Sequence, residues 1–396
     1  MKKRPYIKDK EFKQRVIKVQ EKMEKENLDI LLTFGNEAEP QFIRYFSNYW
    51  PSFETAAVLI PRKGQPYLLI GPESETFANR VSKIDNVRRI LYLRESSEPD
   101  YPGSELSTFE SVLEEVINDT GLEIETVGIA GYSLITKIVY DAFEKSIKRF
   151  TDKRILRSDN IVNELRVVKS EDELACLEYA YDIAKHAMEA VVSHIKVGVT
   201  ENELKGYAMQ EMFSRGAEAE GYPFWIITGN GSNQPVARIR NAVVEEGDLI
   251  QIQVSARYEG YVSTLGRPVV VGEVNDYQRG LIHAGYEVQK AILELAKPGL
   301  NARKISEAHY QVLKNLGYEK FILYGPVHGT GLAENESPWI EEHSDYILEE
   351  GMTFCTCLYL GDDEKDLGIR VEDGFVITKN GSKLLTDYKR ELISIQ

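Results

Sequence analysis

The chain has 396 residues, of which 42% are hydrophobic and 28% charged, proportions typical of a globular protein long enough for two or three domains. Its formal net charge of −15 argues against nucleic acid or an anionic membrane as the main partner, because phosphate contacts need clustered Lys and Arg. There is no apolar run of about eighteen residues and no apolar core after the basic N-terminal stretch, and three cysteines are too few for a disulfide framework, so we expect a cytoplasmic protein without a membrane span or secretion signal.

The first part of the chain alternates predicted helices and strands. Residues 9–27 carry apolar side chains at helical spacing, and the segments LDILLTFG, AAVLIP and PYLLIG are typical of short buried strands separated by Gly and Pro. A helix in STFESVLEEVIND and a strand in TVGIAG continue the alternation. The pattern predicts a three-layer α/β domain over residues 1–158.

The second part, residues 159–396, predicts long helices among strands that pair antiparallel. Ser170 with Glu173, and Thr200 with Glu203, have the spacing of a capping box, which marks the start of a helix. Further helices are predicted over 282–300 and 302–317. The strand-like runs are PFWIITG, GDLIQIQVSA, GRPVVVG, MTFCTCLYL, FVITKNG and SKLLT. The sequence therefore predicts an α+β second domain.

Three segments of this second part carry unusual polar residues. In QIQVSARYEGYVSTLGRP, residues 251–268, the polar face of the predicted strand presents neutral side chains, with Gln253 followed eleven residues later by Thr264. His328 lies in a glycine-rich stretch, GPVHGTGLAENESPWI, where backbone can approach closely. In GIRVEDGFVIT, Arg370 and Glu372 share one face of a predicted strand, which would orient a carboxylate.

With these segments, the whole chain resembles the superfamily of creatinase, prolidase, aminopeptidase P and methionine aminopeptidase. RYFSNYW at 44–50 is similar to a signature of its N-terminal domain, and LRVVKSEDEL at 165–174 to the start of its catalytic domain. The three segments above and GMTFCTCLYL then follow in the family's order. The resemblance implies an α/β N-terminal domain, an α+β C-terminal domain with the pita-bread fold, and a homodimer.

Metallopeptidases of this superfamily hold two divalent ions with Asp, Asp, His, Glu and Glu, because carboxylates bridge and neutralise a pair of cations. The resemblance places Gln253, Thr264, His328, Cys357 and Glu372 at these five positions. Three carboxylates are therefore replaced by neutral residue types. Two dications close together would repel each other with little compensation, so we expect no dinuclear centre and no cofactor.

A single zinc is an alternative that the residues leave open. His328, Cys357 and Glu372, with Thr264 beside them, would be ligands of the types that zinc prefers and would leave a position for water. The alternative interpretation of Cys357 is a small side chain that fills an apolar gap in a strand.

The resemblance to creatinase itself, a member that works without metal, is also incomplete. A histidine that creatinase and the peptidases share corresponds to Val236 here, and the second histidine of the peptidases corresponds to Asn335, before Glu336. Creatine is therefore not the expected substrate, and proline-peptide hydrolysis by the usual mechanism is not expected either.

The remaining residues still permit acid–base chemistry. We expect His328 to move a proton and Glu372 to accept one or to bind a cationic group of a substrate. Substrate-binding roles are expected for Gln253, Thr264, Asn335, Glu336 and Arg370. The alternatives are a histidine with a structural role and a plain ion pair of Glu372 with Arg370.

The sequence thus favours a hydrolase that acts on a C–N bond of a small amino-acid-like molecule or peptide. Two rivals stay open. One is a catalytically inactive protein that binds a small molecule, a peptide or a protein, which the replaced ligands favour. The other is an Xaa-Pro metallopeptidase with substitute ligands or a single zinc.

Overall fold

The computed structural model describes residues 4–396, which form two compact units. One unit is Ile7–Arg166, and the other runs from Val167 to Gln396 together with the start of the chain, where the Tyr258 hydroxyl donates a hydrogen bond to the carbonyl of Pro5. Among the described residues, no helix combines the length and the apolar character needed to cross a bilayer.

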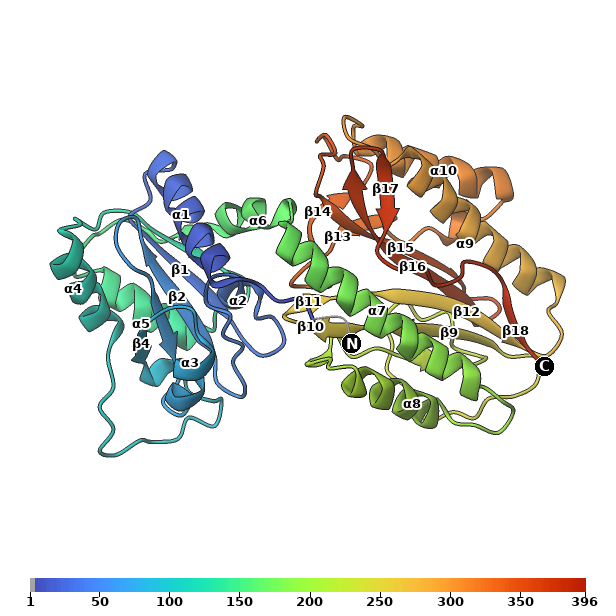
Figure 1. Ribbon diagram of the computed structural model, residues 1–396, viewed down its shortest axis with the longest axis horizontal. Coiled ribbons are helices and arrows are strands. Elements are labelled where there is room, and N and C mark those ends of the chain that lie inside the picture. The colour runs from blue at the N-terminus through green and yellow to red at the C-terminus, as the bar shows by residue number, and fades with distance from the viewer. Residues whose placement is uncertain (1–3) are drawn as a thin grey trace. The chain divides into compact units, whose positions relative to one another are not determined.

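The N-terminal unit is built on a mixed sheet whose described strands follow the order β4-β3-β2-β1-β5-β6 (Figure 1). The strands are β1 Ile30–Gly35, β2 Ala56–Pro61, β3 Tyr67–Ile70, β4 Asn86–Arg89, β5 Val127–Ala130 and β6 Leu156–Arg157. The helices are α1 Asp9–Lys25, α2 Gln41–Ser47, α3 Glu75–Val81, α4 Phe109–Thr120, α5 Lys137–Ile147 and α6 Asp159–Val167, with a 3₁₀ turn at Leu91–Leu93.

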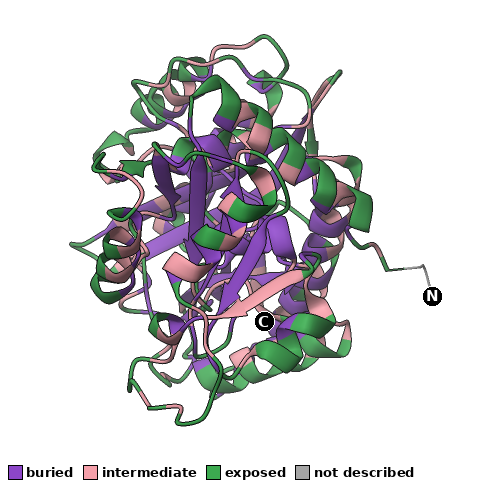
Figure 2. Cartoon of the chain, turned by 90° about the vertical axis from the view of Figure 1, so that its left-hand side faces the viewer, coloured by how far each residue is buried: buried purple, intermediate pink, exposed green. Residues whose placement is uncertain are grey.

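The central strand β1 explains why this unit has three layers. Ile30, Leu32 and Phe34 pack in a core with residues of α4 and α5, whereas Leu31 and Thr33, on the opposite face of the same strand, are also fully buried. A strand buried on both faces needs a helical layer on each side. Strands β1, β2, β3 and β5 are accordingly buried, whereas the edge strand β4 is partly exposed and β6 is exposed. In Figure 2 buried strands lie among helices that carry exposed residues. The predicted α/β class is confirmed.

Helix α6 marks a difference from the sequence analysis. The compact units divide between Arg166 and Val167, whereas the sequence placed the boundary after residue 158. Ile161 and Val162 are buried, and the Arg166 guanidinium lies 5.6 Å from the centre of the Phe42 ring. These contacts hold α6 with the N-terminal unit.

The second unit contains a large sheet with the strand order β14-β13-β15-β16-β12-β9-β8 among the described residues, extended by β17 on β16 and β18 on β12. A small sheet, β11-β10-β7, continues it. The strands are β7 Ala219–Glu220, β8 Ile226–Ile227, β9 Leu249–Val254, β10 Ala256–Tyr258, β11 Tyr261–Val262, β12 Leu265–Val271, β13 Val327–Gly329, β14 Glu336–Ile340, β15 Thr353–Asp362, β16 Leu367–Thr378, β17 Gly381–Leu384 and β18 Ile393–Ile395. The helices are α7 Glu171–His194, α8 Glu201–Ser214, α9 Asp276–Leu295 and α10 Arg303–Leu316, with a 3₁₀ turn at Glu319–Phe321.

The four helices pack in two pairs on this sheet. Helix α7 packs on α8 and on β10–β12, and α9 packs on α10 and on β15 and β16 (Figure 1). The capping boxes predicted at Ser170 and Thr200 are both present and begin α7 and α8. The antiparallel pairing of β12 with β9 and of β15 with β16 completes the α+β pita-bread unit that the sequence predicted.

Candidate active site

Strand register brings the residues singled out in the sequence into one row. Cys357 on β15 lies opposite Glu372 on β16, and Glu372 lies opposite Gly266 on β12. Gly266 in turn lies opposite Gln253 on β9. On the other side of β15, β13 carries His328. Residues separated by more than a hundred positions in the sequence therefore meet on neighbouring strands of a single sheet.

Gly266 makes room for the carboxylate in this row. A Cβ atom at this position would lie 3.1 Å from Cβ and 3.2 Å from Cγ of Glu372. Such contacts are tighter than ordinary van der Waals packing, so a side chain here would push Glu372 away from its partners.

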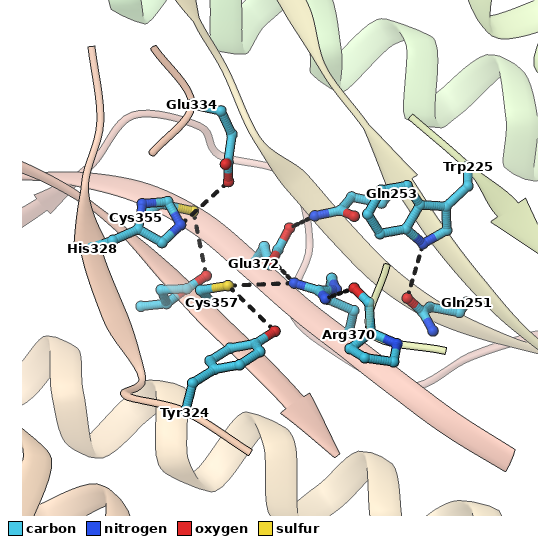
Figure 3. Close-up of polar contacts among 12 residues, drawn as sticks. Trp225, Gln251, Gln253, Tyr324, His328, Glu334, Cys355, Cys357, Arg370 and Glu372 are labelled. Atoms are coloured by element: carbon cyan, nitrogen blue, oxygen red, sulfur yellow. Dashed lines mark hydrogen bonds and ion pairs between the residues drawn. The ribbon is translucent and has the colours of Figure 1, made fainter. Parts of the chain in front are cut away.

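The Glu372 carboxylate is fully buried and accepts hydrogen bonds from two side chains (Figure 3). Its Oε1 accepts a hydrogen bond of 2.7 Å from Nη1 of Arg370, and its Oε2 accepts one from the amide Nε2 of Gln253. The Gln253 side chain thus binds the Glu372 side chain directly. No cation is needed to hold the two together, because an amide and a carboxylate are complementary.

Arg370 contacts both the Glu372 carboxylate and the sulfur of Cys357. Its Nη1 also donates to Sγ of Cys357 at 3.3 Å, and its Nη2 donates to the carbonyl of Pro235. The guanidinium lies 5.6 Å from the Trp225 ring centre and 5.7 Å from that of Tyr359. Burial alone would lower the pKa of Arg370, but the charges of Glu372 and Cys357 raise it well above its ordinary value. The group is a fixed positive charge.

His328 faces an acidic partner that the sequence analysis missed. Its Nε2 lies 3.2 Å from Oε1 of Glu334 (Figure 3). Its Nδ1 lies 2.9 Å from the carbonyl oxygen of Gly329. Burial would lower the pKa of His328, but the charge of Glu334 and hydrogen bonds to Cys357 and Glu334 raise it well above the usual range. Burial likewise opposes ionisation of Glu334, yet the charge of His328 leaves the pKa of this carboxyl lowered.

Several buried polar atoms near this row lack a hydrogen-bond partner within the described chain. They are Oε1 of Gln253, Oγ1 of Thr264, Nε of Arg370 and the hydroxyl of Tyr222. Unpaired buried polar atoms cost about 1–3 kcal/mol each. A polar substrate or ordered water that paired with them would offset this cost.

Two of the expected substrate-binding residues lie differently. Glu336 is buried, and its carboxylate accepts a hydrogen bond of 2.9 Å from the backbone N–H of Ala333. The same carboxylate forms an ion pair with Nζ of Lys169 at 3.4 Å. Asn335 is exposed, in the connection between β13 and β14. In this structure Glu336 holds the loop that positions Glu334, and neither Glu336 nor Asn335 belongs to the row of Gln253, Glu372 and Cys357.

A loop between β8 and β9, residues 228–243, covers one side of the row. Its carbonyls accept hydrogen bonds from strand side chains: Ser232 from Gln251, Asn233 from Tyr359, and Pro235 from Arg370. Val236, which the resemblance aligned with a histidine of the family, is exposed on this loop. Buried Glu201 of α8 fixes both ends of the loop, because its carboxylate accepts from the N–H groups of Thr228 at 3.0 Å and Arg240 at 2.6 Å.

The substitution Glu201→Ala is expected to lower the free energy of unfolding by about 2–3 kcal/mol, since it leaves the buried N–H of Thr228 and the partly buried N–H of Arg240 without acceptors and removes the ion pair of 2.8 Å with the Arg240 guanidinium. Glu211→Ala on the same helix removes a partly exposed ion pair with Arg215 and should cost less than about 1 kcal/mol. Urea unfolding followed by circular dichroism compares the two variants. Equal losses would show that the loop ends are not held by Glu201.

Comparison with known proteins agrees with this architecture. The model of metallopeptidase family M24 matches residues 175–379, and that of the Creatinase/Prolidase N-terminal domain matches residues 15–168. The Xaa-Pro dipeptidase of Pyrococcus furiosus is 29% identical over 379 residues, which cover 93% of this chain and 100% of the relative. That of Pyrococcus horikoshii is 32% identical over 268 residues, 67% of this chain and 76% of the relative.

Solved structures show the same fold. The prolidase from Pyrococcus horikoshii OT3 superposes with a TM-score of 0.81 at 26% identity, covering 96% of this chain and all of that one. With its second unit matched by the family model over most of its length and both units matched by these relatives, the chain belongs to metallopeptidase family M24, within the creatinase and prolidase superfamily.

Proposed function

We propose that this protein is a hydrolase that cleaves a C–N bond in a small amino-acid-like molecule or a dipeptide without a dinuclear metal centre. The observation that carries the proposal is the direct contact between Gln253 and Glu372, with Arg370 on the other carboxylate oxygen. In a two-metal site both side chains would be anions that face the cations.

The donor set does not fit a pair of divalent ions. Of the five family positions, Gln253 and Thr264 are neutral, and the charge of Glu372 is balanced by the Arg370 guanidinium at 2.7 Å. Two dications would add four positive charges to a buried region with little to neutralise them. Among residues 4–396, no group of three His, Cys, Asp or Glu side chains is arranged to hold a metal ion.

The chain's own groups supply a different chemistry. Both oxygens of Glu372 keep lone pairs after their hydrogen bonds, so the carboxylate can also anchor the ammonium group of an amino-acid-like substrate. The unpaired Oε1 of Gln253 and Oγ1 of Thr264 can accept further hydrogen bonds from it. His328, oriented by Glu334, can give a proton to a leaving nitrogen.

The test is hydrolysis by the purified protein of a panel of dipeptides, including Xaa-Pro dipeptides, amino-acid amides and guanidino acids. We expect turnover of at least one member, and His328→Asn should lower its kcat/KM by about 10²–10⁴-fold. If no member is hydrolysed and His328→Asn binds the same ligands as the wild type, the protein is a binder without catalytic activity.

Removal of metals is expected to leave this activity unchanged. Protein dialysed against a chelator and then assayed in metal-free buffer should keep its kcat/KM within about twofold, because no step needs an ion. Elemental analysis of the same samples is the control. Activity that vanishes with the metal and returns with two ions per chain, or with one zinc, would establish a metallopeptidase with substitute ligands.

A further inference from the structure

Cys357 is the strongest nucleophile in the row of side chains described above. Its sulfur lies 3.3 Å from the positively charged Nη1 of Arg370 and 3.7 Å from the hydroxyl of Tyr324. A thiolate, rather than a thiol, attacks carbon, and both neighbours can donate a hydrogen bond to it. Tyr324 also lines a surface cavity of about 390 Å³, and Cys357 itself is 7% exposed.

The surroundings of His328 suit a proton donor. One ring nitrogen faces the Gly329 carbonyl and the other faces the Glu334 carboxylate, and neither of these oxygens can donate a hydrogen bond when the carboxylate is ionised. A neutral imidazole can donate to only one of them, whereas an imidazolium satisfies both. The arrangement therefore stabilises a charged histidine close to the sulfur.

The groups beside Cys357 could hold the ammonium group of a substrate close to the sulfur. Glu372 lies directly opposite Cys357 in the strand pairing, and side chains in such positions have Cβ atoms about 5 Å apart. An ammonium group anchored on Glu372 would bring the carbonyl carbon of the same amino acid, two bonds away, near Sγ of Cys357. The unpaired Oε1 of Gln253, a residue only 2% exposed, is a second acceptor for that ammonium group.

We propose that Cys357 is the nucleophile of the hydrolysis proposed above and that His328 protonates the leaving nitrogen; this inference rests on the proposed function. The thiolate adds to the carbonyl carbon, the C–N bond breaks, and the amine leaves with the proton of His328, which leaves a thioester on Cys357. Water then adds to the thioester, His328 takes one of its protons, and the C–S bond breaks. The sum is one amide and one water converted to an acid and an amine, with no oxidant, reductant or metal required.

Cys355 provides a matched control on the same strand. It lies two residues away and is fully buried, and its sulfur donates to the carbonyl of Thr356 at 3.4 Å. Burial, together with nearby negative charges, raises the pKa of Cys355 well above the usual value, so it stays a thiol. Among the contacts described, the guanidinium contact belongs to Cys357.

Thiol reactivity tests the nucleophile without any substrate. Iodoacetamide at pH 6.5, followed by mass spectrometry of the fragmented peptides, should modify Cys357 at least about 10-fold faster than Cys355, and His328→Asn should reduce this difference. Equal rates for Cys355 and Cys357 in the native protein would overturn the proposal.

Measurements of turnover then test the role of Cys357 as nucleophile and the proposed hydrolysis independently of each other. With the best substrate of the panel, Cys357→Ser should lose at least about 10³-fold in kcat/KM, whereas Cys355→Ser should stay within about threefold. Acid-quenched wild type should carry the mass of the acyl group on Cys357, a measurement that does not depend on how well the variant folds. Turnover that survives in Cys357→Ser overturns only the nucleophile, and absence of turnover in the wild type overturns the function on which it rests.

Addition of zinc tests the opposing interpretation, in which Cys357 is a metal ligand and not a nucleophile. If stoichiometric zinc protects Cys357 from iodoacetamide and is also required for turnover, the sulfur is a ligand and the proposal is wrong. If zinc instead inhibits, or has no effect, while the acyl group is trapped on Cys357, the proposal holds.

Discussion

Arg267→Met is expected to lower the free energy of unfolding of the second unit by about 3–5 kcal/mol, because it leaves a buried carboxylate without its cation. Arg267 and Asp373 are both fully buried, with Nη2 of the arginine 2.9 Å from Oδ1 of the aspartate. The same guanidinium donates to the backbone carbonyl of Glu372 at 2.9 Å and to that of Lys389 at 2.8 Å. Its loss should therefore shift the backbone that carries the candidate catalytic carboxylate.

Tryptophan fluorescence in urea can follow the second unit alone. Trp50 is the tryptophan of the N-terminal unit, so a Trp50→Phe background leaves Trp225 and Trp339 as reporters. Lys383→Met, which removes an exposed ion pair with Glu178, is the matched control and should cost less than about 1 kcal/mol. A loss below about 1 kcal/mol for Arg267→Met as well would mean that Asp373 finds other partners, as its hydrogen bond of 2.9 Å from Gln289 permits.

The helices were predicted well where the sequence contains their stop and start signals. Ser170 and Thr200 begin α7 and α8 as expected, because a capping box is a local interaction among four neighbouring residues. Helix α9 begins at Asp276 instead of residue 282, since Asn275 and Gln278 form a capping box ahead of the apolar residues. The run PFWIITG contains only the short strand Ile226–Ile227, because the loop that follows pairs with side chains instead of a strand.

From the sequence, the site could be predicted only where the family resemblance indicates which strand residues lie beside one another. Gln253 and Glu372 do meet, as their carried-over positions imply. Glu334 was missed because its contact with His328 depends on how the connection between β13 and β14 folds back, and no periodicity in the sequence records that. The ion pair of Glu336 with the buried Lys169, 167 positions away, was also missed, and the substrate-binding role of Glu336 stays a prediction. Homodimer formation and a cytoplasmic location stay predictions.

Carboxylates placed at three of the positions that the resemblance assigns to metal ligands are expected to turn this site into a two-metal site. The triple variant Gln253→Asp, Thr264→Asp, Cys357→Glu would add three negative charges beside the existing His328 and Glu372. Each added carboxylate within about 4 Å of a dication should stabilise it by several kcal/mol at an effective dielectric constant of about 20. After incubation with Mn²⁺ and desalting, we expect about two ions per chain, compared with fewer than one for the wild type.

A neutral variant of similar shape isolates the charge in this experiment. Gln253→Asn, Thr264→Asn, Cys357→Gln presents amides where the first variant presents carboxylates, so both disturb the packing alike and differ by three charges. Without metal the carboxylate variant should be the less stable of the two, because like charges repel in a buried site, and Mn²⁺ should reverse that order. Because Arg370 neutralises Glu372 in both variants, only the added carboxylates can account for the difference. Two ions retained by the wild type, or equal metal content in both variants, would show that charge is not what keeps a dinuclear centre out of this protein.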